Sequence, residues 1–367
     1  MTTTLRRLAL PLSCAALLMS GCVSRFTSAP APAIAPPSGM GAVQTPRMSR
    51  PARTMDVWML NVGKGACTFI ACPDGKSNIL VDCGSDSLGA TPDNMITQWI
   101  NEKNQAAATV TVLVSHGHRD HISMLREKDG VNPALVNTLM LGGMKDDYTK
   151  AFHAWASKVQ SPATYFKAAE FKANDSRFQC GTARVDLLTA NATEVANPAS
   201  YSSKKNADSA IVRVSLGKHA VIIPGDAEGI SEQSAIDNAA RHGLELTGAT
   251  LLIASHHGAN THGSNGNGWL DAASPHAGAF SAKIDAMHRH PRCDIVAAYK
   301  DADKVSPIFD MVCGNGTKKS ETALAARLFN THENGHVLAR ITSGGVKYLC
   351  QTVTPSCDAE LPEEMMP

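Results

Sequence analysis

The sequence predicts an α/β protein whose strands end in histidine-rich loops. Residues 109–115 (TVTVLVS) form a β-branched run that is long enough for a buried strand. This run leads into the hexapeptide HGHRDH at residues 116–121. A second short apolar run, residues 250–254, delivers Ser-His-His-Gly at residues 255–258. Because α/β proteins build their sites at strand ends, we expect the functional site at these loops.

The composition is that of an ordinary globular protein. Of the 367 residues, 43% are hydrophobic and 18% are charged, which fits one large domain or two small ones. The formal net charge is +1, so the chain as a whole has no electrostatic attraction to nucleic acid.

Residues 1–22 are typical of an export signal, with Arg6 and Arg7 before an apolar stretch at residues 8–19. The end of this segment, MSGC, is similar to a bacterial lipobox, which makes Cys22 the expected lipidation site; ordinary signal cleavage is the alternative. No later stretch is long and apolar enough to cross a membrane. We therefore expect an exported protein of the bacterial cell envelope, attached to a membrane only through its lipid.

Cysteine usage also fits export. Eight of the ten cysteines follow the signal, which allows up to four disulfides in an oxidising compartment. A hairpin turning at residues 73–76 places Cys67 opposite Cys83, and Cys350 and Cys357 can close a short loop. The other pairings are not readable from the sequence. A zinc-cysteine site is the alternative, although the chain has no CxxC pair.

The elements follow a regular order along the chain. Residues 23–52 are rich in Pro and Ala and predict a flexible linker. The folded domain is expected at residues 53–355, followed by an acidic, frayed tail at residues 356–367. The expected strands are residues 56–61, 67–71, 78–82, 109–115, 136–141, 185–188, 210–216, 220–223 and 250–254. The expected helices are residues 146–160, residues 231–242 and one that begins at Thr91 and buries Met95, Ile96, Trp99 and Ile100.

The hexapeptide has the chemistry of a metal site. Imidazole nitrogen and carboxylate oxygen are the ligands that borderline divalent metals prefer. The one-residue spacing lets His116 and His118 point the same way from an extended backbone, while Asp120 and His121 face a neighbouring position. One loop can therefore serve two metals.

HGHRDH also matches the HxHxDH motif of the metallo-β-lactamase superfamily. The surrounding blocks resemble one branch, the hydrolase domain of ComEC-type DNA-uptake proteins, here as a stand-alone exported lipoprotein. These blocks are MLNVGKGACTFI with NILVDCG, SHGHRDHI, NADSAIVRVSLGKHAVIIPGDAE, and LLIASHHGANTHGS followed by HRHP. The resemblance implies a four-layer αββα sandwich with two divalent metal ions at one edge, between the sheets.

Carried over by position, the resemblance implies the metal ligands. His116 and His118 would hold the first metal, and Asp120 and His121 the second. Asp226 would bridge both ions, because each of its two oxygens can bind one.

One residue of the pair His256 and His257 would complete the second site, with a slight preference for His256; the other is then a solvated neighbour. Zinc is the expected metal, and manganese is the alternative. Asp82 would lie behind the loop and orient its ligands, unless it only forms a turn at the strand end.

The chain departs from the superfamily pattern at the first metal. No histidine lies between His153 and His219 to supply the usual third imidazole. Asn206, Asp208 and Ser209 occupy that stretch, and Asn206 and Asp208 are expected next to the ligands. His290, in HRHP, matches a family position near the site and is expected to donate a proton or hold a phosphate; a surface histidine is the alternative.

The ions determine the expected chemistry. Two adjacent divalent cations lower the pKa of a shared water and produce hydroxide at neutral pH, with Asp120 and Asp226 orienting it. We expect a phosphodiesterase or nuclease that acts on a small or polymeric phosphoester, DNA included. The alternatives are hydrolysis of another ester or amide, such as a β-lactam, and a binding or assembly lipoprotein without turnover. The oligomeric state is not readable from the sequence.

Overall fold

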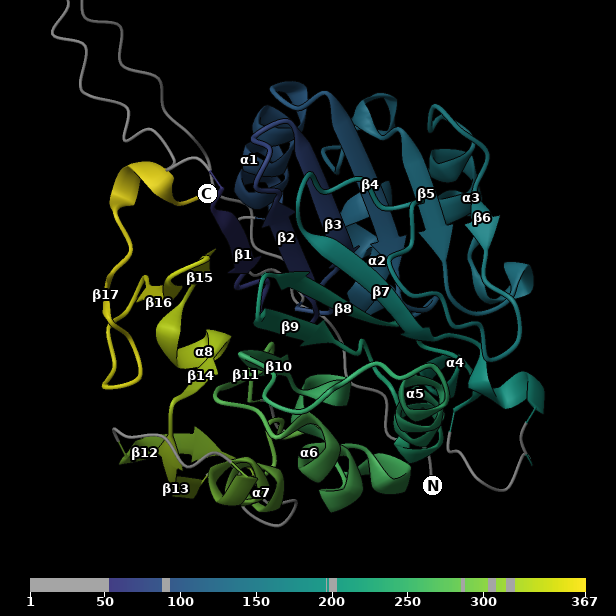
Figure 1. Ribbon diagram of the computed structural model, residues 1–367. Coiled ribbons are helices and arrows are strands. Elements are labelled where there is room, and N and C mark those ends of the chain that lie inside the picture. Colours follow the sequence, from purple (N-terminus) through teal and green to yellow (C-terminus); the bar gives the residue numbers. More distant parts are fainter. Residues whose placement is uncertain are drawn as a thin grey trace, which may run out of the picture. The chain divides into compact units, whose positions relative to one another are not determined.

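Strands that are buried along most of their length build two sheets that pack face to face. The computed structural model describes residues 53–87, 93–195, 197, 203–284, 288–302, 308–314 and 321–367 (Figure 1). The expected signal, Cys22 and linker lie outside these residues. Val57 and Ile79 of one sheet and Val212 and Val221 of the other belong to a single buried cluster, which forms the core between the sheets.

The first sheet has the strand order β17-β16-β15-β1-β2-β3-β4-β5-β6 within the described residues. Its strands are β1 (Met55–Met59), β2 (Cys67–Ala71), β3 (Ser77–Cys83), β4 (Thr109–Val114), β5 (Thr138–Leu141), β6 (Thr164–Tyr165), β15 (Val337–Thr342), β16 (Gly345–Cys350) and β17 (Ala359–Glu360). Strands β3 to β6 run parallel to one another.

The second sheet has the strand order β14-β11-β10-β9-β8-β7. Its strands are β7 (Arg184–Thr189), β8 (Ile211–Leu216), β9 (His219–Ile223), β10 (Leu251–Ile253), β11 (Gly278–Phe280) and β14 (Leu328–Asn330). A separate hairpin joins β12 (Ile308–Cys313) to β13 (Glu321–Ala326).

Helices cover both outer faces. The helices are α1 (Asp93–Gln105), α2 (Arg119–Arg126), α3 (Lys150–Ala156), α4 (Lys204–Ala207), α5 (Gly229–Arg241), α6 (Asn267–Ala273), α7 (Cys293–Ala302) and α8 (Thr331–Asn334). Ile100 of α1 and Phe152 of α3 pack with the outer face of the first sheet, and Ala235 of α5 and Trp269 of α6 pack with that of the second. Figure 1 shows α5, α6 and α7 beneath the second sheet. The αββα order of layers confirms the predicted sandwich.

Two expected details of the helices are wrong. The helix predicted for residues 146–160 is shorter, because Thr149 caps α3 by accepting a hydrogen bond from Phe152 N. Met95 was expected in the core, yet it is 53% exposed. Its neighbours Ile96 and Trp99 are buried as expected. No described helix is long and apolar enough to cross a membrane.

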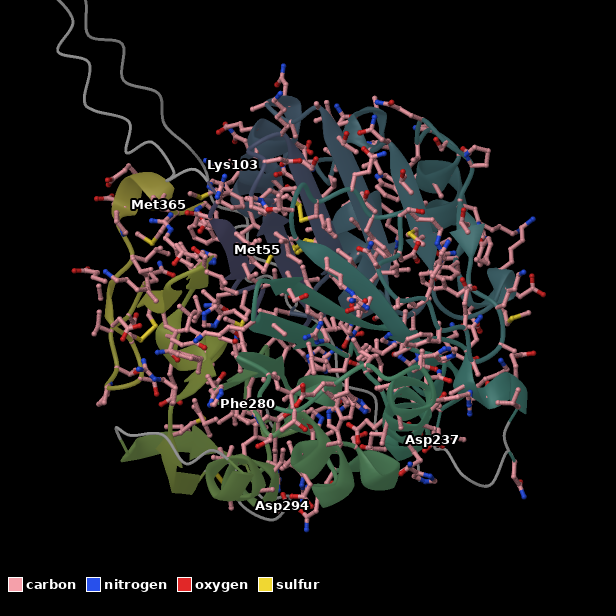
Figure 2. All side chains as sticks on the ribbon, viewed as in Figure 1. Met55, Lys103, Asp237, Phe280, Asp294 and Met365 are labelled. Carbon is pink, nitrogen blue, oxygen red and sulfur yellow. A yellow bond between two sulfur atoms is a disulfide. The ribbon has the colours of Figure 1, made fainter. Side chains whose placement is uncertain are left out.

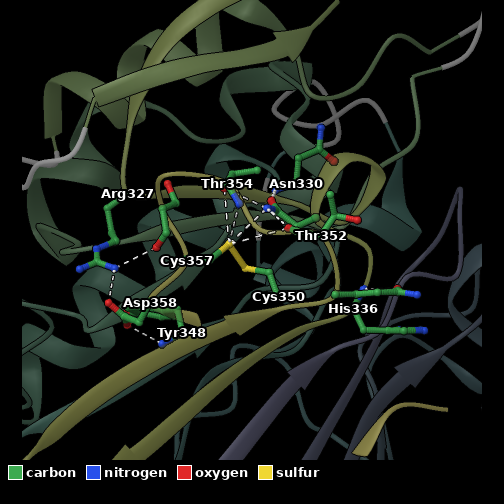
Figure 3. The surroundings of a disulfide bond; sticks show 12 residues. Arg327, Asn330, His336, Tyr348, Cys350, Thr352, Thr354, Cys357 and Asp358 are labelled. Carbon is green, nitrogen blue, oxygen red and sulfur yellow. Dashed lines mark hydrogen bonds and ion pairs between the residues drawn. A yellow bond between two sulfur atoms is a disulfide. The ribbon is translucent and has the colours of Figure 1, made fainter. Parts of the chain in front are cut away.

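The expected fraying of residues 356–367 is also wrong. Strand β17 pairs with β16, and the Leu361 side chain is buried in the core. Asp358 accepts hydrogen bonds from Tyr348 N and Arg327 Nη1 beside the Cys350–Cys357 disulfide (Figure 3).

The end of the chain reaches α1. Trp99 Nε1 donates a hydrogen bond to Met365 O, so the end of the chain lies beside Lys103 and the rest of α1 (Figure 2). Buried contacts thus hold a segment whose composition alone predicts disorder.

All eight cysteines of the described chain form disulfides. The predicted pairs Cys67–Cys83 and Cys350–Cys357 are confirmed, and Cys72–Cys180 and Cys293–Cys313 complete the set. The alternative of a zinc-cysteine site is therefore wrong. Four disulfides are typical of proteins that fold in an oxidising compartment.

Candidate metal centre

The histidine loop is placed by the central strand of the first sheet. Strand β4 is buried along most of its length and delivers His116 at its carboxyl end, while α2 begins at Arg119 and carries His121 in its first turn. Gly117 separates the first two histidines, where a Cβ atom would lie 2.7 Å from Asp147 O. Only glycine fits at this position without a shift of the backbone.

The second sheet supplies the other half of the centre. Asp226 follows β9 through Gly225, which has a φ of 58° and packs so closely on Ser115 that a Cβ would lie 2.5 Å from the Cβ of that serine. The two-histidine turn, η5 (Ser255–Gly258), follows β10. His256 N donates a hydrogen bond to Gly225 O, which ties this turn to the loop that carries Asp226.

The converging side chains form two groups that could hold metal ions, and the groups share Asp226. One group consists of Asp120, His121, Asp226 and His257, and the other of His116, His118 and Asp226; in each, the ligand atoms lie within 4.8 Å of one another. The structure therefore brings together the five ligands that were each expected at a single position and one histidine of the 256–257 pair, His257.

His256 is the residue left out of these groups. His257 Nε2 lies 3.3 Å from Asp120 Oδ2 and 3.4 Å from Asp226 Oδ1. His256 Nε2 approaches only Asp226, at 3.7 Å from Oδ2. The geometry thus reverses the expected preference for His256.

Buried polar atoms of the first group have no hydrogen-bond partner within the described chain. His121 Nε2 and Asp226 Oδ1 lie 2.9 Å apart without forming a hydrogen bond, and His257 Nε2 also lacks one. Burying polar atoms without hydrogen-bond partners costs free energy. These three atoms lie around one common position, where a bound ion would contact all of them. This donor set of imidazole nitrogen and carboxylate oxygen fits a divalent cation.

The Nδ1 atoms of His116, His121 and His257 are hydrogen-bonded to the surrounding protein, which turns the Nε2 atoms of these rings toward the centre. His257 Nδ1 donates to Ser281 O at 2.7 Å. His121 Nδ1 donates to Asp82 Oδ2 at 2.9 Å. Ser115 Oγ donates to the same Asp82 oxygen and accepts from His116 Nδ1 at 3.1 Å. In His121 and His257 the Nε2 lone pair is therefore left for a cation, while His116 Nε2 and His118 Nδ1 lie 3.0 Å from each other, where one ion could bind both.

Asp82 lies behind the loop, where it was expected. Its Oδ1 accepts a hydrogen bond from Ser115 N at 2.6 Å, in addition to the contacts of Oδ2. Asp82 has a φ of 55°, and its two oxygens contact both the backbone and the side chains of the histidine loop. These contacts hold Asp82 in the left-handed conformation and orient His121.

Asp208 does not lie next to the ligands, contrary to expectation. Its carboxylate accepts hydrogen bonds from Thr193 and Lys204, which fasten α4 to the preceding turn. Ser209 takes its place: Ser209 Oγ accepts from Asp226 N and contacts His116 Nδ1 at 3.3 Å. Asn206 is buried, and its Oδ1 has no hydrogen-bond partner.

The electrostatics match a site that is completed by cations. Burial alone would lower the pKa of His121, but the Asp226 and Asp82 carboxylates raise it well above its usual value. Burial would raise the pKa of Asp226, but His121 and His257 hold it well below its usual range. Without a metal, protons on the imidazoles balance the carboxylates; a divalent cation replaces those protons.

A cavity of about 360 Å³ opens over both groups. Its wall includes Lys64, Arg119, Asn206, Lys283, His288 and His290. Arg119 lies 3.5 Å from Asp86, which also lines the cavity, so this ion pair offsets part of the positive charge that Lys64 and Lys283 bring to the wall.

His290 reaches this wall as expected, and burial together with the neighbouring histidines lowers its pKa to about 3. The neutral ring can donate a hydrogen bond to a bound anion. Sequence reasoning missed Ser281 and Lys283, which no motif marks, and gave no role to His288, the first residue of HRHP.

No protein family and no curated protein matches the sequence. Several solved structures are similar, including the following three. YhfI from Bacillus subtilis, a metallo-β-lactamase fold protein, is 16% identical, with 69% of this chain and 94% of that chain covered and a TM-score of 0.42. A mutant of the CmlA β-hydroxylase is 12% identical, with 80% and 54% covered and a TM-score of 0.42. The metallo-β-lactamase SMB-1 is 15% identical, with 54% and 78% covered and a TM-score of 0.30.

Proposed function

We propose that this protein is a metal-dependent hydrolase that cleaves phosphodiester bonds. The observation that carries the proposal is the pair of His/Asp groups that share Asp226, at the base of a cavity whose wall holds Lys64, Arg119 and Lys283. Binuclear centres that share one carboxylate are suited to displacement at phosphorus, because both the attacking and the leaving oxygen need a partner.

The side chains of the centre have separate roles in metal binding and in substrate binding. Divalent ions, when bound, activate water and stabilise the charge that develops on the phosphoryl oxygens. His116, His118 and Asp226 would hold one ion, and Asp120, His121 and His257 would hold the other together with Asp226. Zinc suits these ligands, and manganese is the alternative. Asp120 and Asp226 also accept hydrogen bonds from the attacking water, and His290 donates one to a non-bridging oxygen.

The cavity wall supports an anionic substrate. Lys64 and Lys283 attract the charge that a phosphodiester carries at its reacting centre, whereas the lactam ring of a β-lactam is uncharged at that centre. DNA has weaker support, because the basic residues outside the cavity are partly neutralised: Lys204 pairs with Glu194 and Asp208, and Arg177 pairs with Asp175. A small phosphodiester or a polymer end that enters the cavity fits best.

We also propose that the protein works in the bacterial cell envelope and is anchored through a lipid on Cys22. The signal-like residues 1–22 and the four disulfides support this location. Cys22→Ser is expected to move the protein from the membrane fraction to the soluble fraction. Unchanged fractionation would argue against the lipid.

The central experiment combines metal analysis with turnover. The wild type is expected to contain divalent metal and to hydrolyse bis-p-nitrophenyl phosphate, while Asp120→Ala loses at least about 10²-fold in kcat. Plasmid DNA and a cephalosporin are tested in parallel. Wild type without metal or turnover would support the alternative of a binding or assembly lipoprotein. If the wild type cleaves only the cephalosporin, the proposed substrate is wrong and the protein is a β-lactam hydrolase.

A further inference from the structure

The two-histidine turn has an unusual backbone. His256 and His257 have φ values of 48° and 55°, in the left-handed region that non-glycine residues rarely adopt. A left-handed pair costs free energy, so the surroundings must hold it in place. The position of His257 Nε2 near Asp120 and Asp226 depends on this backbone.

The Asn265 side chain holds both ends of the turn. Its Nδ2 donates to Ser255 O at 2.9 Å and to Ala259 O at 2.8 Å. Its Oδ1 accepts from Ser255 N at 3.0 Å. Asn265 is only 1% exposed, so water does not compete for these hydrogen bonds.

Two further buried side chains fix Asn265 and the turn. Glu232, on α5, accepts hydrogen bonds from Ser255 Oγ at 2.7 Å and from Asn265 N at 2.8 Å. Tyr299, on α7, donates its hydroxyl to Asn265 Oδ1 at 3.0 Å. The polar groups satisfy one another away from solvent, which favours a single arrangement of the network.

We propose that Glu232, Asn265 and Tyr299 form a clamp that positions His257 for metal binding. The inference rests on the proposed metal centre and adds residues that no ligand motif contains. The clamp residues hydrogen-bond to Ser255, to Ala259 and to one another and contact no metal ligand in these bonds, so they are positioning residues. Because His257 belongs to one of the two groups, the clamp acts on one metal ion.

The test is zinc titration of the metal-free full chain by calorimetry. Asn265→Ala is expected to weaken one of the two zinc sites by about 10- to 100-fold and to leave the other near its wild-type affinity. Asn238→Ala is the matched control, since Asn238 is also a buried asparagine of this half and donates to Leu188 O away from the turn. It is expected to keep both sites.

Circular dichroism and thermal unfolding establish that the variants are folded. If Asn265→Ala does not fold, Tyr299→Phe takes its place, because it removes a single hydroxyl; a weakened second site in that variant supports the clamp. Wild-type affinity at both sites in a folded clamp variant would overturn it, as would equal losses in Asn238→Ala. Wild type that binds no zinc would refute the proposed metal centre instead, a result distinct from failure of the clamp.

Discussion

At the residue scale, His256 and His257 are neighbours in sequence, but only one of them is placed to bind a metal ion. Both are left-handed, but only His257 approaches Asp120, and its far nitrogen is held by Ser281 O. Ser281 comes from a distant part of the chain after β11, so the choice between the two histidines depends on packing rather than on the motif.

Asn206 lies in the stretch where the sequence lacks the histidine expected from its resemblance to the metallo-β-lactamase superfamily. We predict that Asn206→His strengthens zinc binding at the His116/His118 group by at least about tenfold, because zinc prefers imidazole to an amide oxygen. Competition with a chromophoric chelator measures the affinity, and Asn206→Ala serves as the control that adds no ligand. Equal zinc affinity in Asn206→His and the wild type would contradict the prediction.

The cationic cavity wall predicts a change in substrate binding. Lys64→Gln and Lys283→Gln are each expected to raise KM for bis-p-nitrophenyl phosphate several-fold, about 1 kcal/mol, with a smaller change in kcat, because the charges attract ground state and transition state alike. Steady-state kinetics at low and high salt provide the measurement. Lys347→Gln, on strand β16, is the control. A KM that is insensitive to both substitutions and to salt would speak against the cationic wall.

The protonation of the metal-free centre predicts how zinc affinity depends on pH. Against the effect of burial, the pKa of His121 and of His257 is raised by the facing carboxylates, so both rings hold a proton more tightly than a free imidazole does. Zinc must displace these protons. Apparent affinity should therefore fall as pH drops, by up to about tenfold per pH unit for each proton. A buffered titration between pH 8 and pH 6 measures this, and a flat profile would contradict it.

At the scale of elements, the last residues of the chain complete the first sheet. Deleting residues 356–367 removes β17, the buried Leu361 and one cysteine of a disulfide. We predict a loss of at least about 3 kcal/mol in the free energy of unfolding, measured by urea. Leu361→Ala should lose part of this, about 2 kcal/mol. An unchanged urea midpoint after the deletion would show that residues 356–367 do not stabilise the fold.

At the scale of the whole molecule, one disulfide closes the longest loop. Cys72, after β2, is bonded to Cys180, before β7, at a sequence separation of 108 residues, so the bond joins the first sheet to the second. Replacing both cysteines by serine is expected to lower the free energy of unfolding by about 3–5 kcal/mol, because the unfolded chain regains entropy. Urea unfolding without reductant measures the loss, and the same variant in reductant is the control. A stability equal to that of the oxidised wild type would refute this account.

The sequence by itself determined the features that depend on local spacing. The HGHRDH pattern placed His116, His118, Asp120 and His121 on one loop after a buried strand, and the hairpin register set Cys67 opposite Cys83. The β-branched and apolar runs predicted most of the strands, and the resemblance of the motif blocks implied the αββα sandwich. Neighbours within a few residues fix these features, so they can be read without the fold.

Only the tertiary structure decided the features that join distant segments. The exclusion of His256 from the two groups, the place of Ser209 instead of Asp208 beside the ligands, the Cys72–Cys180 bond and the burial of Leu361 all depend on how the two sheets meet. Spacing along the chain does not encode these contacts, because they arise from packing between surfaces that are far apart in sequence.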